Sequence, residues 1–371
     1  MSTIDHLEEL SELFLFMADA DFGGYCPLYE QLARWVATQS DLLDFISTSA
    51  NPNARRGRIP VLFFAATHER VLADPSSELA AIYRGESSAN PVDAFTKLVE
   101  TQRTAIANSM RTRSVQTNEV GRSAVLALGV ERAVNDIHAR IDLFEIGPSA
   151  GLNLFFDQFH ITYLRNSQIV ATRGPQSSTV HLEGELRSAL LPKTETSALL
   201  LGSRIGIDPN PIDVVSEDQC RWLEACLWPG IPDRPQRLEA ALALASAAPP
   251  HLIRGDAALD LSTHLATLSD DNHLVIFSTW ALSYIATSGR ENILEVIDRL
   301  GETRDLDFLT FEEPKFAPWI EKPLAYESYL GEGTPTVLGL RSWRQGTCTS
   351  TPLAIAHPHG RWIHWVEEID G

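Results

Sequence analysis

The residues best suited to chemistry lie in one short segment, residues 142–153 (DLFEIGPSAGLN). Glu145, Gly147, Ser149 and Gly151 are spaced two apart, directly after an apolar run and before helical periodicity resumes. Small residues let the backbone turn sharply and approach a ligand, and free N–H groups at a helix start favour anionic or polar ligand groups. A carboxylate at a strand end accepts hydrogen bonds from ribose hydroxyls or from a ligand ammonium. The segment therefore predicts a strand, a tight turn and a helix start that bind a small nucleotide-like ligand.

Further polar residues follow other apolar runs of the chain. Asp208, Asp256 and Ser278 stand at or directly after such runs, at the ends of RIGID, LIRGD and LVIFS. Ligands of open parallel sheets bind beyond the carboxyl ends of the strands, so we expect these residues to join the same site. For each aspartate taken alone, the alternative is a residue that only caps a helix or a turn.

These residues can form one site only if their strands have their carboxyl ends at the same edge of a sheet. The apolar runs are residues 141–146, 203–207, 251–254, 274–277 and 307–311. The helix-like stretches between them include residues 218–226, 235–245 and 290–300. Strands that alternate with helices indicate an α/β fold with a parallel sheet covered on both faces. Strand-like residues near the end of the chain predict an antiparallel terminal hairpin that closes the sheet edge; they are 336–343, 352–356 and 359–366.

Residues 1–139 carry helical signals and hardly any strand signal. Leu10, Phe14 and Met17, for example, recur at three- and four-residue steps, which places them on one face of a helix. We therefore expect a helical N-terminal cap region over residues 1–139 and an α/β domain over residues 140–371.

The α/β domain is expected to contain an insertion at about residues 159–199. The stretch from Glu145 to Asp208 is much longer than the ~20 residues that a compact nucleotide-binding unit needs before the acid that holds ribose. Strand-like pieces at residues 161–164 and 179–183 predict that the insertion forms a hairpin.

The composition argues against several classes of partner. The 371 residues carry a formal net charge of −19 and a pI of about 5.0. A surface this acidic repels phosphate backbones and anionic lipid heads, so we expect binding neither to nucleic acid nor to a membrane. A small-molecule substrate is favoured, although the charge also serves solubility alone. The oligomeric state is left open.

Cysteines and apolar segments indicate the compartment. Cys26, Cys220, Cys226 and Cys348 form no C-x-x-C pair, and so few cysteines do not build a disulfide framework in a chain of this length. The first residues, MSTIDHLEEL, carry acids where a signal peptide needs a basic region. No apolar run approaches the roughly 20 residues that span a bilayer. We therefore expect a cytoplasmic protein.

The two-residue spacing of EIGPSAG, followed by Asp208, Asp256 and the terminal hairpin, resembles the core of class I S-adenosylmethionine-dependent methyltransferases. The resemblance implies a Rossmann-like methyltransferase-type sheet, S-adenosylmethionine as cofactor, and transfer of its methyl group to an acceptor that the sequence does not identify. It also implies a set of cofactor-binding residues: Glu145, Gly147, Ser149, Gly151, Asn153, Asp208, Asp256, Ala257 and Ser278. In this comparison Ser149 stands where the methyltransferases usually have glycine.

Nearly the whole chain also resembles a bacterial family catalogued only as a domain of unknown function (DUF2332-like). The segments that carry this resemblance are PLYE from Pro27, QTNEVGR from Gln116, EIGPSAGLN from Glu145, GIDPNP from Gly206, RGDA from Arg254 and PHGRW from Pro358. The resemblance is specific for the family, but it implies no substrate.

Other residues are candidates for the substrate side of the site. Asn118, Glu119 and Arg122 predict either a helix start with a weak Glu119–Arg122 pair or a polar cluster beside the cofactor. Trp280 and Tyr284 predict an apolar substrate pocket, or a part of the core.

Two histidines are candidates for a general base. His357 and His359 lie two apart, which places them on one side of a strand and allows metal binding. No third ligand accompanies them at a recognisable spacing, so we expect no metal site. A turn with Pro358 and Gly360, or a contact with substrate, is favoured. With Glu119 they are the candidate catalytic residues, and the sequence does not decide among them.

The letters GPSAG permit a different chemistry, because they match the G-x-S-x-G nucleophile elbow of α/β-hydrolases. Ser149 would then be the nucleophile, Glu312 or Glu313 the acid, and His357 or His359 the base. That fold needs several strands before the elbow, whereas the preceding residues have helical periodicity. A third hypothesis is a non-catalytic protein that keeps the cofactor pocket for sensing or for structure.

Overall fold

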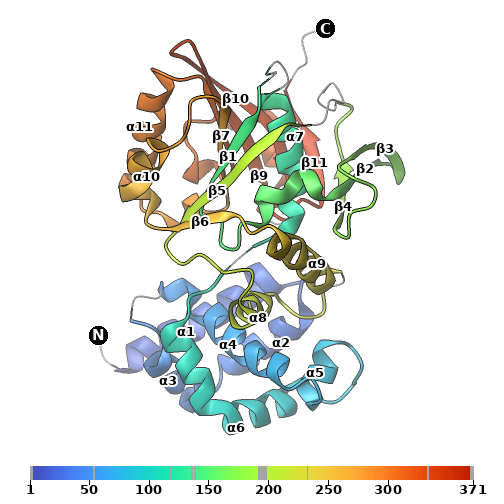
Figure 1. Ribbon diagram of the computed structural model, residues 1–371. Coiled ribbons are helices and arrows are strands. Elements are labelled where there is room, and N and C mark those ends of the chain that lie inside the picture. Colours follow the sequence, from blue (N-terminus) through green and yellow to red (C-terminus); the bar gives the residue numbers. More distant parts are fainter. Residues whose placement is uncertain are drawn as a thin grey trace. The chain divides into compact units, whose positions relative to one another are not determined.

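The computed structural model describes residues 3–52, 55–116, 118–134, 137, 139–190, 199–231, 233–331 and 334–367. The chain divides into two compact units (Figure 1). The first unit is Met1–Thr117 with Ser216–Gln236, and the second is Asn118–Val215 with Arg237–Gly371. Each unit is therefore built from two stretches of the chain.

The first unit is helical throughout its described part. It contains α1 (Thr3–Met17), the π-helix η1 (Ala18–Phe22), α2 (Pro27–Val36), α3 (Ser40–Ser49), η2 (Arg56–Arg58), α4 (Ile59–Ala73), α5 (Glu78–Tyr83), α6 (Pro91–Thr112) and α8 (Glu217–Ala225). Leu10, Phe14 and Met17 of α1 are at most 3% exposed, as their spacing predicts. None of the described helices combines the length and the apolar character that crossing a membrane requires.

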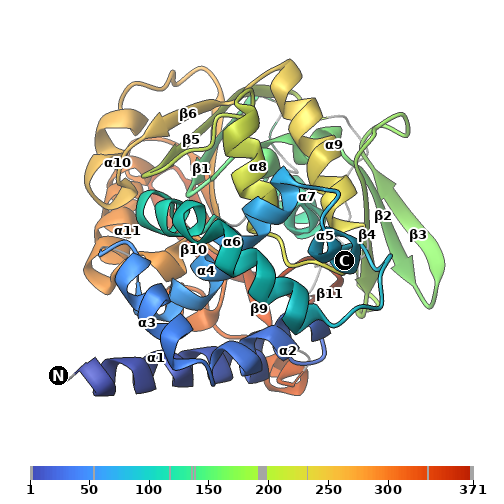
Figure 2. The same ribbon diagram turned by 90° about the horizontal axis from the view of Figure 1, so that it is seen from below.

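Helix α8 comes late in the chain and yet lies among the helices of the first unit (Figure 2). Its Trp222 is 1% exposed and belongs to the same apolar core as Phe14 of α1, Phe64 of α4 and Phe95 of α6. The Trp222 indole N–H donates to the carbonyl of Ser114 at 2.8 Å, so the buried ring keeps its hydrogen bond. The aromatic core therefore fixes α8 in this unit.

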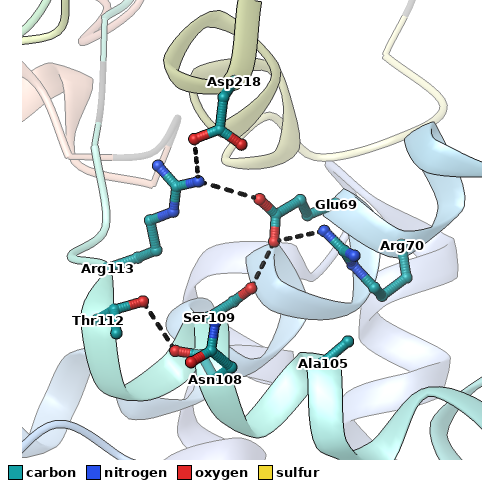
Figure 3. A pocket seen from close by; sticks show the side chains of 8 residues that line it. All are labelled: Glu69, Arg70, Ala105, Asn108, Ser109, Thr112, Arg113 and Asp218. Atoms are coloured by element: carbon teal, nitrogen blue, oxygen red, sulfur yellow. Dashed lines mark hydrogen bonds and ion pairs between the residues drawn. The ribbon is translucent and has the colours of Figure 1, made fainter.

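A polar network joins α4, α6 and α8 (Figure 3). Buried Glu69 of α4 accepts a hydrogen bond from Ser109 of α6 at 2.5 Å and pairs with Arg70 at 3.0 Å. Arg113 lies 3.5 Å from Glu69 and 2.6 Å from Asp218 of α8. Two acids and two guanidinium groups thus neutralise one another around a pocket of about 390 Å³. We interpret this pocket as a junction between helices, because its charges are already paired.

The second unit is built around a sheet of 11 described strands in the order β3-β2-β4-β11-β10-β9-β8-β7-β1-β5-β6. The strands are β1 (Ile141–Ile146), β2 (His160–Arg165), β3 (Gln168–Arg173), β4 (His181–Leu186), β5 (Leu201–Asp208), β6 (His251–Arg254), β7 (His273–Thr279), β8 (Leu306–Glu312), β9 (Thr336–Arg344), β10 (Thr347–Ala356) and β11 (Trp362–Trp365). The longer helices are α7 (Ser123–Ala133), α10 (Ala257–Leu265), α11 (Thr287–Gly301) and, from Arg237 on, α9 (Arg234–Ala247). The expected α/β fold with a large, mostly parallel sheet is confirmed.

Helices cover both faces of this sheet. Phe308 of β8 packs in one core with Leu261 of α10 and Ile297 of α11. The next residue, Leu309, lies instead against Gly129 of α7. Because successive side chains of a strand point to opposite faces, α10 and α11 cover one face and α7 covers the other.

The order of the parallel strands reverses beside β1. The strands β6-β5-β1-β7-β8 are all parallel, and β1 is the first of them in the chain. The chain therefore adds β5 and β6 on one side of β1, and then β7 and β8 on the other side. In open α/β sheets, ligands bind in the crevice at the carboxyl ends of the strands where the order reverses. That point lies between the ends of β1 and β7.

The inserted strands and the last strands are arranged differently from the expected hairpins. β2 and β4, which contain the strand-like pieces at 161–164 and 179–183, pair in parallel, and the hairpin is formed by β2 and β3. β9, β10 and β11 are antiparallel as expected, but they do not close the sheet edge. Trp362 and Ile363 of β11 pair with Glu185 and Leu186 of β4, so the insertion extends the sheet beyond them. The predictions of a β2–β4 hairpin and of a terminal edge were wrong.

We predict that Gly301→Ala destabilises the second unit. Alanine usually stabilises an exposed helix position by up to ~1 kcal/mol, but a Cβ at residue 301 would overlap the indole of Trp343 on β9. Overpacking of this kind costs about 1–3 kcal/mol. Thermal and urea unfolding measure the effect. Gly57→Ala is the control, because a Cβ there would meet no atom within 4 Å; equal stability of the two variants would contradict the prediction.

Candidate functional site

The turn after β1 has the sharp backbone that its small residues predict. Gly147, Ser149 and Gly151 have φ of 71°, 54° and 69°, a region that glycine adopts without steric cost. A Cβ on Gly147 would overlap Ala281, which follows β7, so this position also needs glycine for space. The helix that follows, η4 (Leu152–Gln158), is a short 3-10 helix. Its few aligned peptides contribute little of the dipole that favours anions, so binding at this turn would depend on side chains and individual N–H groups.

Glu145 ends β1 as a buried acid, 1% exposed, and its Oε2 has no hydrogen-bond partner. Burial and, to a smaller extent, the charge of Asp208 raise the pKa of Glu145 to about 8, while the guanidinium of Arg122 and a hydrogen bond with Asn153 oppose the shift. At neutral pH this carboxyl is therefore largely protonated. A cationic ligand group beside it would favour the charged form instead.

A second buried acid ends β8. Glu312 is 1% exposed, and its Oε1 accepts hydrogen bonds from Ser278 Oγ at 2.9 Å and from the N–H groups of Ala281 and Leu282. Its Oε2 has no partner. Burial raises the pKa of Glu312 to about 7. The carboxyl thus holds the loop after β7 and keeps one oxygen available for a ligand.

Arg122 joins three segments at the ends of these strands. It is 5% exposed; its Nη1 donates to the carbonyl of Thr279 and its Nε to the carbonyl of Pro358, each at 3.0 Å. Its guanidinium also lies 5.8 Å from the centre of the Trp280 ring. Arg122 lies in a short 3-10 helix, Val120–Arg122, directly before α7. Glu119 caps this short helix and Arg122 contacts the strand ends, so features of both alternatives, a helix start and a polar cluster, are present.

The residues before Arg122 contact both the turn after β1 and the turn after β10. Asn118 Nδ2 donates to the carbonyl of Pro148 at 2.7 Å, and its Oδ1 has no partner. Glu119 Oε1 accepts from the N–H of Gly121, and Glu119 Oε2 lies 3.1 Å from His359 Nδ1. The pair of Glu119 and His359 has the geometry in which a carboxylate orients a histidine base.

We define the buried polar cluster by the polar residues at these strand ends that are at most 6% exposed: Asn118, Glu119, Arg122, Glu145, Ser149, Asn153, Ser278, Thr279 and Glu312. Asn153 links its members, since its amide contacts Ser123 Oγ at 2.9 Å and Thr279 Oγ1 at 3.4 Å. Four buried atoms of the cluster have no hydrogen-bond partner: Asn118 Oδ1, Glu145 Oε2, Ser149 Oγ and Glu312 Oε2. Most buried polar atoms are satisfied, so four such atoms at the strand reversal indicate a place for a polar ligand or water.

The two later aspartates have local partners. Asp208 accepts from the N–H of Ser149 at 3.0 Å and from the N–H of Asn210 at 2.7 Å, which ties the turn after β1 to the loop after β5. Asp256 caps α10 by accepting from the N–H of Ala258, and Ala257 packs in the apolar core. The helix-cap alternative therefore describes Asp256 in this structure.

The aromatic candidates differ in their surroundings. Trp280, with φ of 60°, donates its indole N–H to Thr336 Oγ1 at 3.1 Å and lies beside Arg122. Tyr284 is 36% exposed and lies in the 3-10 turn Leu282–Tyr284. Trp280 therefore adjoins the buried polar cluster, whereas Tyr284 faces solvent.

The groups expected for a serine hydrolase are not joined into a triad. Ser149 Oγ has no hydrogen-bond partner, so no base holds it. Glu312 binds the loop after β7, and Glu313 pairs with Lys315 at 2.7 Å. A nucleophile and its base normally lie within hydrogen-bond reach, with looser contacts in ligand-free enzymes.

The two histidines lie in the turn after β10. His357 Nδ1 accepts from the N–H of His359 at 3.0 Å, and burial lowers the pKa of His357 to about 3. His357 is therefore neutral at physiological pH. In the described ranges, no three His, Cys, Asp or Glu side chains are grouped as a metal site would require, and Cys26, Cys220, Cys226 and Cys348 form no disulfide.

A scan against protein families matches residues 11–365 to the family described as an uncharacterized protein conserved in bacteria (DUF2332). The chain belongs to this family. No curated protein matches the chain closely enough to serve as a relative. The family match covers the first unit together with the buried polar cluster of the second.

We predict that Glu145→Gln raises the free energy of unfolding relative to wild type, and that this gain increases as the pH rises from 5 to 8. The unfolded acid titrates near its ordinary pKa, whereas the folded acid titrates near 8, so folded Glu145 keeps a proton that the unfolded chain releases. Wild-type stability therefore falls through this window, and glutamine removes the dependence. At about 1.4 kcal/mol per pKa unit, the difference should grow by on the order of 3 kcal/mol. Urea unfolding at several pH values measures it; a difference that stays constant, as expected for exposed Glu291→Gln, would contradict the assignment.

Proposed function

We propose that the second unit binds S-adenosylmethionine at the ends of β1 and β7 and transfers its methyl group to a small-molecule acceptor. The observation that carries this proposal is the position of Glu145. It combines a buried carboxyl, an unpartnered oxygen and a following turn of left-handed small residues at the point where the strand order reverses.

The residues present suit this cofactor chemically. Glu145 would accept a hydrogen bond from the methionine ammonium, and the cation would favour its ionised form. Asp208 keeps acceptor capacity beyond its two backbone bonds, because a carboxylate offers about four lone-pair sites, and it would hold the ribose hydroxyls. Asn118 and Ser149 add two unpartnered oxygens. Because Ala281 closes over Gly147, we expect the loop after β7 to shift when a cofactor binds.

When bound, S-adenosylmethionine supplies a methyl group on a sulfonium, which an acceptor nucleophile displaces. The chain's own task is then to position the acceptor and exclude water. An acceptor O–H or N–H loses a proton, and two groups are suited to receive it. Glu312 has an unpartnered oxygen and a pKa of about 7, and His359 is oriented by Glu119.

Titration calorimetry with S-adenosylmethionine and S-adenosylhomocysteine tests the proposal. We expect saturable binding of both, and about 10- to 100-fold weaker binding by Glu145→Gln, since a hydrogen bond to a charged group contributes about 1.5–3 kcal/mol. Exposed Glu291→Gln should bind like wild type. Absence of both heat and a thermal shift with either ligand would reject the proposal. Binding without turnover of any acceptor would favour a sensing protein that uses the same site.

A fluorophosphonate probe tests the hydrolase alternative. Because Ser149 Oγ contacts no base, we expect no labelling of wild type above the level of Ser149→Ala. Labelling of wild type that Ser149→Ala abolishes would show an activated serine and would replace the methyltransferase proposal.

A further inference from the structure

The first unit contains a pocket of about 620 Å³ that the proposed function does not use. It lies among α4, α5 and the segment that follows α8, and all its lining residues belong to the first unit. Sites for small molecules usually measure about 300–1,000 Å³ and combine apolar walls with a few placed polar groups. Here the walls include Val71, Leu72, Leu227 and Trp228. We call it the Tyr83 pocket.

Two buried aromatic residues supply its polar groups. Tyr83 is 6% exposed; its hydroxyl interacts with the hydroxyl of Tyr29 and forms no hydrogen bond to any other described residue. His68 Nδ1 lies 3.2 Å from the carbonyl of Ala225 and 3.1 Å from that of Leu227. Both carbonyls are acceptors, so Nδ1 carries the hydrogen and Nε2 is left as an acceptor. Burial lowers the pKa of His68 to about 4, so the ring is neutral at pH 7. The pocket thus offers acceptors and a hydroxyl, and none of its lining residues is a buried cation.

The aromatic rings and the charged lining residues of the Tyr83 pocket both favour a positively charged ligand group. The rings of Tyr83 and His68 meet edge to face at 5.1 Å, and the pocket is also lined by Trp228. Aromatic faces attract cations. The charged lining residues are three carboxylates, Glu86, Glu224 and Asp233, against one guanidinium, Arg84, which pairs with Glu86 at 2.7 Å. A positive ligand group is therefore favoured, and an anionic one is repelled.

We propose that the Tyr83 pocket is a second ligand site, which binds an organic cation with an apolar body, such as an aromatic amine. The apolar body fills the walls, the positive nitrogen lies against the rings of Tyr83 and Trp228, and an N–H of the ligand donates to Tyr83 or His68. This site does not depend on the buried polar cluster or on S-adenosylmethionine.

Calorimetry on the full chain at pH 7 tests the proposal with tryptamine, benzyltrimethylammonium and indole-3-propionate. We expect both cations to bind, and the anion to bind at least about tenfold more weakly. Tyr83→Phe should weaken the binding of tryptamine by about threefold to tenfold, which corresponds to the loss of one net hydrogen bond. It should affect benzyltrimethylammonium less, because that cation has no N–H. Asparagine tolerates the φ of 61° found at residue 233, so Asp233→Asn should leave the backbone unchanged. Loss of the negative charge should weaken the binding of both cations by about two- to fivefold.

Two further variants make the outcome unambiguous. Gln236→Trp places an indole at the exposed lining of the pocket and should abolish binding of both cations. Glu12→Gln removes the same charge as Asp233→Asn at an exposed position of α1 and should change nothing. Melting curves establish that each variant is folded. Failure of both cations to bind, equal binding of the anion, or unchanged binding by folded Gln236→Trp would overturn the proposal, whether or not the chain binds S-adenosylmethionine.

Discussion

The second unit depends on the burial of one guanidinium group. Arg122 is almost fully inside the protein, and it donates to two carbonyls from distant parts of the chain, those of Thr279 and Pro358. A buried charge is tolerated only where dipoles and opposite charges compensate it. The described compensation includes the dipoles of these two carbonyls, and the charge of Arg122 in turn opposes the rise in the pKa values of Glu145 and Glu312. Burial raises the pKa of Glu145 to about 8 and that of Glu312 to about 7, so both carboxyls titrate close to neutral pH, where a group can both accept and release a proton.

Much of the fold could be predicted from the sequence, because local patterns determine it. β7 and β8 are buried along their whole lengths, and strands of this kind are rich in apolar residues, as residues 274–277 are here. α2 begins at Pro27, where a proline at the first helical position is favoured. The pairing of β2 with β4 could not be predicted, because strand partners are set by tertiary contacts. β3 has a mostly exposed pattern that resembles a loop as much as a strand.

The candidate site was predictable in its position and less so in its chemistry. The turn with Gly147 and Gly151 is a local signal, whereas the sequence leaves the segment with Asn118, Glu119 and Arg122 open between a helix start and a polar cluster. Glu312 enters the sequence analysis only as a possible triad acid. Its burial and its pKa of about 7 arise from tertiary packing, which residue spacing in the sequence does not indicate. Asp256 was assigned to a cofactor, yet its position directly before α10 makes it a helix cap. The Tyr83 pocket could not be predicted, since its residues come from separate segments that only the fold brings together.

The position of β11 has a consequence for how the sheet can assemble. Among the described strands, β11 alone connects the β2–β4 segment to the rest of the sheet, through Trp362 and Ile363 on one side and β10 on the other. It also follows every other described strand in the chain. A ribosome therefore delivers both parts of the sheet before the strand that joins them, and until then the edges of β4 and β10 remain unpaired. Exposed edges of this kind recruit other chains, so the docking of β11 removes two edges on which a strand of another chain could pair.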